Sequence, residues 1–133
     1  MKRSALIVGA GSGLSSSLAL QCANLGMDVA LAARNIEKLE DLGIQTGASL
    51  HKCDASKIED VNRLFKDLDE KLGIPELVVY NPSARLRGAI ETLDAEKTKE
   101  ALDVTCFGAF LVAQQATTRM LKRGSGSIFF TGA

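Results

Sequence analysis

Hydrophobic residues fall into two alternating kinds of segment along this chain. Short, mostly apolar segments are typical of strands that are buried on both faces of a sheet. Strands are predicted at residues 5–8, 28–33, 48–53, 77–80 and 127–130, although residues 48–53 include polar side chains. Between them, apolar residues recur at helical spacing over residues 14–25, 36–42, 58–72 and 94–122. This alternation predicts an α/β fold, a doubly wound parallel sheet of the Rossmann type. Right-handed crossovers then predict the strand order 3-2-1-4-5, with a ligand crevice at the carboxyl ends of strands 1 and 4.

Residues that end or cap helices divide these segments. Gly26 is expected to end the first helix, because glycine is favoured just beyond a helix C-terminus. Asn35 is a candidate N-cap for a short second helix, which Gly43 is expected to close. Ser56 and Glu59 have the spacing of a capping box at the start of the third helix.

The turn after the first predicted strand has the most informative sequence. Three glycines alternate here with other residues, and a helical pattern follows at once. Glycine allows close backbone approaches, and the unpaired amides at a helix N-terminus attract a phosphate. A dinucleotide site is therefore predicted, and the simpler alternative is a glycine turn that only joins strand to helix. The predicted cofactor-binding residues in this segment are Gly9, Gly11, Ser12, Gly13 and Leu14.

Two polar residues follow the next strands. Arg34 comes directly after the second strand, where a carboxylate would bind the ribose 2′-hydroxyl of NAD and an arginine suits the 2′-phosphate of NADP. This favours NADP over NAD, unless Arg34 is only a surface residue near a helix start. Asp54 follows the third strand. It is either an acceptor for the adenine amino group or a loop acid near a helix N-terminus.

Composition limits the other classes of function. The 133 residues are 46% hydrophobic and 24% charged with zero formal net charge, so they predict one globular domain with no preference for nucleic acid or membrane. The apolar segment after Met1 is too short for a signal peptide. Cys22, Cys53 and Cys106 lack metal-ligand spacing, so no metal site is expected; they are typical of reduced thiols in a cytoplasmic protein.

At the level of motifs, the sequence resembles the first half of a short-chain dehydrogenase/reductase. Residues 9–15 resemble the family's Thr-Gly-x-x-x-Gly-x-Gly loop, with Val8 in place of threonine and Ser15 in place of the last glycine. Asp54 falls on the adenine-contacting aspartate of the family. The remaining matched segments are residues 80–83 on the Asn-Asn-Ala-Gly turn, 104–110 on the Val-Asn-x-x-Gly-x-Phe segment and 126–133 on the strand that leads to the catalytic serine.

The resemblance implies that residues 1–133 are a dinucleotide-binding domain, incomplete relative to the family. It implies hydride transfer between a nicotinamide and a carbonyl or alcohol substrate, and it adds Asn81 to the cofactor-binding residues. Thr105 stands where the family has asparagine, and Ala133 stands at the serine position. The Tyr-x-x-x-Lys motif is missing, since Tyr80 is the only tyrosine. No catalytic residue is therefore assigned, and this chain alone is expected to be inactive.

Two further expectations concern partners. Apolar residues of the 94–122 helix cover more than one face, and the last strand has no helix after it. These features favour either an incomplete enzyme or a short form that forms a homo-oligomer through the Asp94–Lys122 helix. A non-catalytic NAD(P)-binding sensor or partner module is the alternative function. His51, Arg85 and Arg87 are expected to be structural or solvent-exposed, and the substrate is not predicted.

Overall fold

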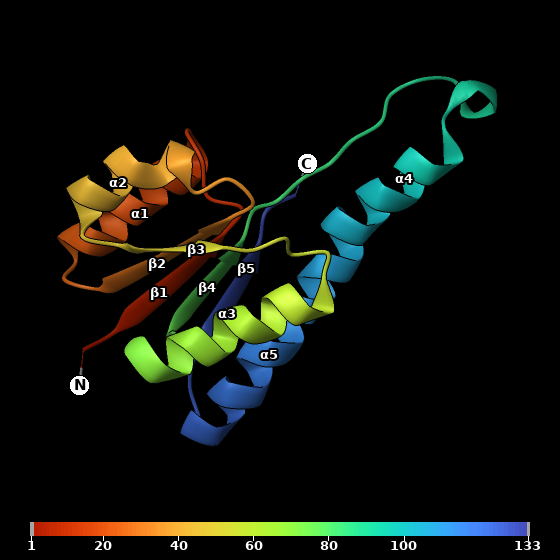
Figure 1. Cartoon of the computed structure of the whole chain (residues 1–133). Coiled ribbons are helices and arrows are strands. Elements are labelled where there is room, and N and C mark those ends of the chain that lie inside the picture. The colour runs from red at the N-terminus through yellow and green to blue at the C-terminus, as the bar shows by residue number, and fades with distance from the viewer. Residues whose placement is uncertain (1, 133) are drawn as a thin grey trace.

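A parallel sheet forms the centre of the molecule in the computed structural model, which describes residues 2–132 (Figure 1). Its strand order is β3-β2-β1-β4-β5, which confirms the predicted order and the α/β fold class. The strands are β1 (Ser4–Val8), β2 (Asp28–Ala33), β3 (Ser49–Lys52), β4 (Leu77–Tyr80) and β5 (Ser127–Phe130). All four pairings between neighbouring strands are parallel.

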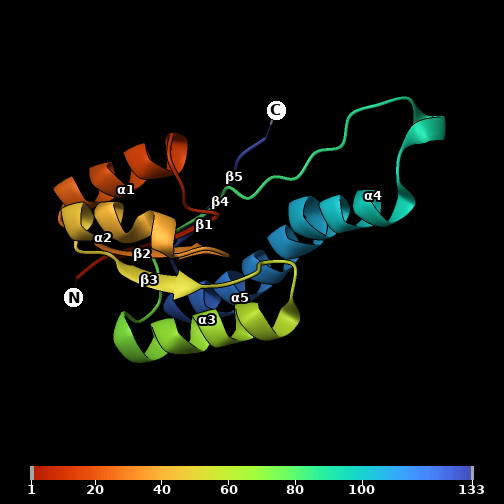
Figure 2. The same ribbon diagram turned by 45° about the horizontal axis from the view of Figure 1, so that its top comes forward.

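The central strand β1 is buried along its whole length, because it pairs on both edges and helices cover both of its faces. On one face lie α1 (Leu14–Asn24) and α2 (Glu40–Thr46), and on the other lie α3 (Ile58–Lys71) and α5 (Gly108–Arg123) (Figures 1 and 2). Two separate apolar clusters fill these interfaces. The continuous apolar character of the strands follows from this double cover.

Helix α3, in the layer that it forms with α5, is strongly amphipathic. The predicted stripe on α3 is buried against the sheet, where its buried members are Val61, Leu64, Phe65 and Leu68. Arg119 of α5 joins the two helices, since its guanidinium donates to both carboxylate oxygens of Asp69 at 2.8 Å and lies 5.1 Å from the Phe65 ring centroid. This pairing lowers the pKa of Asp69.

Two of the predicted helix signals were wrong. Helix α2 continues past Gly43 to Thr46 and ends at Gly47, whose φ of +68° is left-handed. Gly43 instead lies against Leu50, where a Cβ would come within 3.3 Å of the leucine side chain. The predicted capping box is absent too, because the Ser56 hydroxyl donates to Asp54 and no side chain caps the start of α3.

The predicted 94–122 helix is present, but its winding changes along its length. Helix α4 (Ala95–Leu102) begins at Asp94, whose side chain accepts a hydrogen bond from the Lys97 amide. A π-helical segment (Asp103–Phe107) follows and leads into α5. Helix α4 extends beyond the edge of the sheet (Figures 1 and 2).

Large apolar side chains remain exposed on the last third of the described residues. One is Ile90, which precedes α4, and the others belong to the long helix and to β5: Leu102, Phe107, Phe110, Leu121, Phe129 and Phe130. This agrees with the expectation of an uncovered strand, and the homo-oligomer remains a prediction. Within residues 2–132, no helix is long and apolar enough to cross a membrane. Ala133, the predicted serine position, lies outside the described residues.

Candidate functional site

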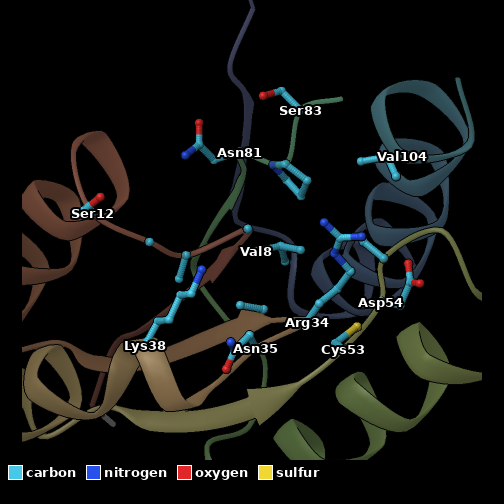
Figure 3. A pocket seen from close by; sticks show the side chains of 16 residues that line it. Val8, Ser12, Arg34, Asn35, Lys38, Cys53, Asp54, Asn81, Ser83 and Val104 are labelled. Carbon is cyan, nitrogen blue, oxygen red and sulfur yellow. The ribbon is translucent and has the colours of Figure 1, made fainter. Parts of the chain in front are cut away.

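A cavity of about 560 Å³ opens at the carboxyl ends of the strands, where the alternation of strands and helices predicted a crevice (Figure 3). The loops that follow β1, β2, β3 and β4 all contribute to its lining. The lining residues that matter below are Gly9, Gly11, Ser12, Arg34, Lys38, Cys53, Asp54, Asn81 and Val104. Six of the eight predicted cofactor-binding residues thus line one cavity, while Gly13 and Leu14 lie outside the lining, where α1 begins.

The glycine loop is fixed to the sheet through its first two amides. The backbone N–H groups of Gly9 and Ala10 both donate to the Ala32 carbonyl, at 2.8 and 3.1 Å. Gly9 has a φ of +79°, and a Cβ there would lie 2.4 Å from the Pro82 nitrogen. Only glycine therefore fits between the end of β1 and the turn after β4.

The N-terminus of α1 has no side-chain cap. Its N-cap is Gly13, which has no side chain to offer the first amides, and its first turn holds no acidic residue. The amides and the positive end of the helix dipole are therefore available to an anion. This is the arrangement that a phosphate group requires.

The segment after β2 carries two basic side chains that line the cavity. Arg34 and Lys38 both line the cavity, and Figure 3 shows them as sticks on the β2 side of it. Within residues 2–132 neither cation forms a salt bridge. Between them, the Asn35 side chain accepts from the Glu37 amide and shapes the turn into the helix. Lys38 was missed in the sequence, because residues 34–36 are not helical and no regular spacing relates Lys38 to Arg34.

Asp54 and its neighbours line the cavity after β3, the strand that pairs with β2. The Asp54 carboxylate accepts from the amide and the hydroxyl of Ser56, at 3.0 and 2.6 Å. The Asp54 amide in turn donates to Asp60 at 2.8 Å, and this hydrogen bond is the main cause of the lowered pKa of Asp60. Val104 lines the same side of the cavity as Asp54 (Figure 3), so an acidic acceptor and an apolar side chain are both available there. Both features suit a purine ring.

Cys53 lies in the same lining but is buried, and burial raises its pKa to about 11. Since the thiolate is the reactive form, Cys53 is expected to resist a thiol reagent at neutral pH, as is the buried Cys22. Cys106 is exposed and is expected to react. Labelling the folded protein with a disulfide reagent, followed by peptide mass analysis, should modify Cys106 first. Modification of Cys53 at a comparable rate would contradict the burial of this wall.

The hydroxyl groups of Tyr80 and Thr105 both donate to backbone carbonyls. Tyr80 is 3% exposed, its hydroxyl donates to the Val104 carbonyl, and burial raises its pKa far above the ordinary value. Thr105 donates to the Ala101 carbonyl at 2.8 Å. Neither residue lines the cavity. Neither hydroxyl is thus placed to exchange a proton with a ligand in the cavity.

The other singled-out residues lie outside the cavity. His51 is buried in the edge strand β3, its ring nitrogen lies 2.9 Å from the Ser49 hydroxyl, and burial lowers its pKa. Arg85 and Arg87 are exposed in the loop between β4 and α4. Among residues 2–132 no three His, Cys, Asp or Glu side chains are grouped to hold a metal ion.

Comparisons with known proteins agree with this geometry. The family model described as "short chain dehydrogenase" matches residues 3–133. A farnesol dehydrogenase of Aedes aegypti is 33% identical over 126 residues, which cover 90% of this chain and 51% of that protein. The chain thus spans about half the length of this relative.

Solved structures give the same result. A short-chain type dehydrogenase/reductase from Mycobacterium marinum superposes with a TM-score of 0.93 at 28% identity, over 98% of this chain and 56% of its own. An alcohol dehydrogenase from Thermococcus sibiricus, solved with 5-hydroxy-NADP, gives a TM-score of 0.87 at 26% identity, over 98% and 57%. From its fold, its crevice and the matched family model, the chain belongs to the short-chain dehydrogenase family.

Proposed function

We propose that this chain is the NADP-binding part of a short-chain oxidoreductase that transfers hydride between the nicotinamide and a carbonyl or alcohol substrate. Membership of the family supports the reaction class. The complex of the Thermococcus sibiricus relative with 5-hydroxy-NADP supports the cofactor class. The choice of NADP depends on this chain's own residues.

One observation carries that choice: the segment that follows β2 contributes two cations and no carboxylate to the lining of the cavity. Arg34 and Lys38 line it, and Asp54 is the sole acidic residue among the lining residues that the structure describes. An NAD site of this fold uses a carboxylate after the second strand to bind the ribose hydroxyls. A guanidinium in that position instead presents paired donors to a phosphate, and a nearby ammonium adds a point charge.

Different groups of this chain then bind different parts of the dinucleotide. The amides of the glycine loop and of the first turn of α1 bind the diphosphate. Arg34 and Lys38 bind the 2′-phosphate, and Asp54 accepts from the adenine amino group beside Val104. The bound nicotinamide supplies the hydride chemistry. No residue in the described part of the chain is assigned as the acid or base.

Arg34→Ala tests this assignment. We expect the variant to bind NADPH at least about 10-fold more weakly while its affinity for NADH changes less than about twofold, because the lost contact is to a charged phosphate. Lys38→Ala should show a smaller effect of the same kind. Titration of each coenzyme, followed by the fluorescence of the reduced nicotinamide, measures both constants.

Arg85→Ala is the matched control, since it removes an exposed arginine that does not line the cavity. Its two dissociation constants should equal those of the unchanged protein. An unchanged preference in Arg34→Ala would remove Arg34 from the 2′-phosphate site. Failure of the unchanged protein to bind either coenzyme would contradict the whole proposal.

A non-catalytic NAD(P)-binding module is the second candidate. It is favoured by the Thr105 hydroxyl and the Tyr80 hydroxyl, both of which are hydrogen-bonded to the backbone outside the cavity. For both candidates we expect no oxidation of NADPH by the 133-residue chain with any carbonyl compound. Reading the coding sequence beyond residue 133 separates them: a Tyr-x-x-x-Lys motif there supports the oxidoreductase, and a stop codon supports the module.

A further inference from the structure

Three polar side chains form a continuous hydrogen-bonded path from the end of β5 to the glycine loop. The Thr131 hydroxyl lies 2.7 Å from the Asn81 amide oxygen. The Asn81 amide nitrogen lies 2.6 Å from the Ser15 hydroxyl, and that hydroxyl lies 3.3 Å from the Gly9 carbonyl oxygen. We call Thr131, Asn81 and Ser15 the relay.

The relay has one direction of donation. The Ser15 hydroxyl donates to the Gly9 carbonyl, so it accepts from the Asn81 NH₂ group. The other end of that amide is then an oxygen, which accepts from Thr131. Because every donor points the same way, each hydrogen bond polarises the next. The Gly9 carbonyl is the final acceptor.

Gly9 belongs to the candidate phosphate site and also accepts the last hydrogen bond of the relay. Its N–H is fixed on the Ala32 carbonyl, and Pro82 packs against its Cα. The Ser15 hydroxyl fixes the carbonyl on the other side of the same residue. The direction of the following amides, which line the cavity from Ala10 to Ser12, depends on how this peptide is held. Ser15 is itself only 1% exposed, so its hydroxyl has little access to water as an alternative partner.

Two features make the relay particular to this chain. Ser15 stands where the family motif has its last glycine, and glycine has no hydroxyl to contribute. Thr131 does not line the cavity and is linked to it only through Asn81. Its backbone amide separately pairs with the Tyr80 carbonyl at 3.1 Å, so β5 stays attached to β4 when the side chain is changed.

We propose that Thr131 and Asn81 are positioning residues for the phosphate-binding loop, and that they transmit the position of the end of β5 to Gly9 through Ser15. This rests on the proposed function, because the loop is taken to bind the diphosphate of NADP. Asn81 accordingly acts on the loop through its contacts with Ser15 and Thr131.

Thr131→Val tests the relay, because it removes the hydroxyl and keeps the shape of the side chain. We expect the dissociation constant for NADPH to rise about threefold to tenfold. Thr131→Ser keeps a hydroxyl and should restore the original constant. Thr118→Val is the matched control, since it removes a threonine hydroxyl that donates to a helical carbonyl on α5, and it should leave binding unchanged.

The Ser15→Gly background shows whether the effect passes through the relay. Glycine at position 15 breaks the path, so Thr131→Val should have no further effect on NADPH binding there. If Thr131→Val weakens binding equally in both backgrounds, or in neither, the relay is wrong. An effect of Thr131→Val on the melting temperature without an effect on the dissociation constant also overturns the proposal, since that is the result of a purely structural role.

Amide hydrogen exchange in the free protein tests the relay without any cofactor. The Gly9 and Ala10 amides, both bonded to Ala32, should exchange several-fold faster in Thr131→Val than in Thr118→Val. Unchanged exchange overturns the relay even if NADPH binds. If NADPH fails to bind the unchanged protein, the proposed function is wrong, and the exchange rates still decide whether the relay holds the loop.

Discussion

Gly9→Ala is expected to lower the free energy of unfolding by about 2 to 5 kcal/mol, the sum of left-handed backbone strain and overpacking. The residue has a φ of +79°, which an L side chain rarely adopts. The added Cβ would also lie 2.4 Å from the Pro82 nitrogen and 2.7 Å from its Cδ, and neither atom belongs to a flexible side chain. Urea unfolding followed by circular dichroism measures the change.

Gly11→Ala is the matched control for this prediction. Gly11 belongs to the same loop, but its φ is not in the left-handed region, and a Cβ there meets nothing within 4 Å. We expect its free energy of unfolding to change by less than about 0.5 kcal/mol. Equal stabilities of the two variants would show that Pro82 does not pack closely against Gly9.

Gly9→Ala should also bind NADPH more weakly at temperatures where it remains folded, because its peptide leads into the candidate phosphate loop.

Gly108→Leu is expected to be comparably damaging, with a loss of about 3 kcal/mol or more from overpacking. Leucine is a good helix former, so the loss does not come from helix propensity. Gly108 is the first residue of α5, and its first added carbon would lie 2.3 Å from the Tyr80 hydroxyl and 2.9 Å from the Ala55 carbonyl oxygen. The helix would therefore have to move away from the loop after β3. Thermal or urea unfolding provides the readout.

Gln114→Leu is the control, since it places the same side chain at an exposed position of α5. Its stability should change by less than about 0.5 kcal/mol. A double-mutant cycle of Gly108→Ala with Tyr80→Phe then tests the contact itself. Because Tyr80→Phe removes the oxygen that the new methyl group meets, the double variant should be more stable than the sum of the single effects predicts. Strict additivity would indicate that the Tyr80 hydroxyl is not the obstacle.

Movement of α5 should also reach the cofactor site. Val104 lines the cavity with Asp54, and its backbone carbonyl, in the π-helical segment, accepts a hydrogen bond from the Tyr80 hydroxyl. Gly108 brings this segment close to Ala55. The wall beside the expected adenine position therefore depends on a glycine that lies outside the cavity. NADPH and NADH share the adenine ring and differ in the 2′-phosphate. Gly108→Leu should therefore weaken the binding of both coenzymes equally, unlike a change at the 2′-phosphate site.

The fold was largely predictable because its main signals are local. An uninterrupted apolar strand such as Ser4–Val8 needs cover on both faces, and the intervening helical patterns supply it. Strand order follows from the right-handedness of the crossovers. The position of the crevice follows as well, because all the parallel strands end at the same edge of the sheet. The strand order reverses between β1 and β4, and a crevice opens at that point.

The errors arose where a particular side-chain contact overrode a sequence signal. Gly43 is a residue type typical of a helix end, yet it lies inside α2, where the absence of a side chain leaves room for Leu50. Ser56 and Glu59 have the spacing of a capping box, yet the Ser56 hydroxyl donates to the Asp54 carboxylate instead. The π-helical segment has no period of its own in the sequence. It coincides with the hydrogen bond between Tyr80 and Val104, residues that are 24 positions apart.

The layers, the strand order and the glycine loop could be predicted from the amino-acid sequence, because periodicity, handedness and backbone freedom are properties of short segments. The positions of Arg34 and Asp54 after their strands could be predicted as well. The folded chain was needed to show that Lys38 lines the cavity with Arg34 and that Thr131 is linked to Gly9 through Asn81 and Ser15. The physical reason is that a side chain selects its partner from whatever the packed strands bring within hydrogen-bond distance, and that choice is not encoded in any one segment.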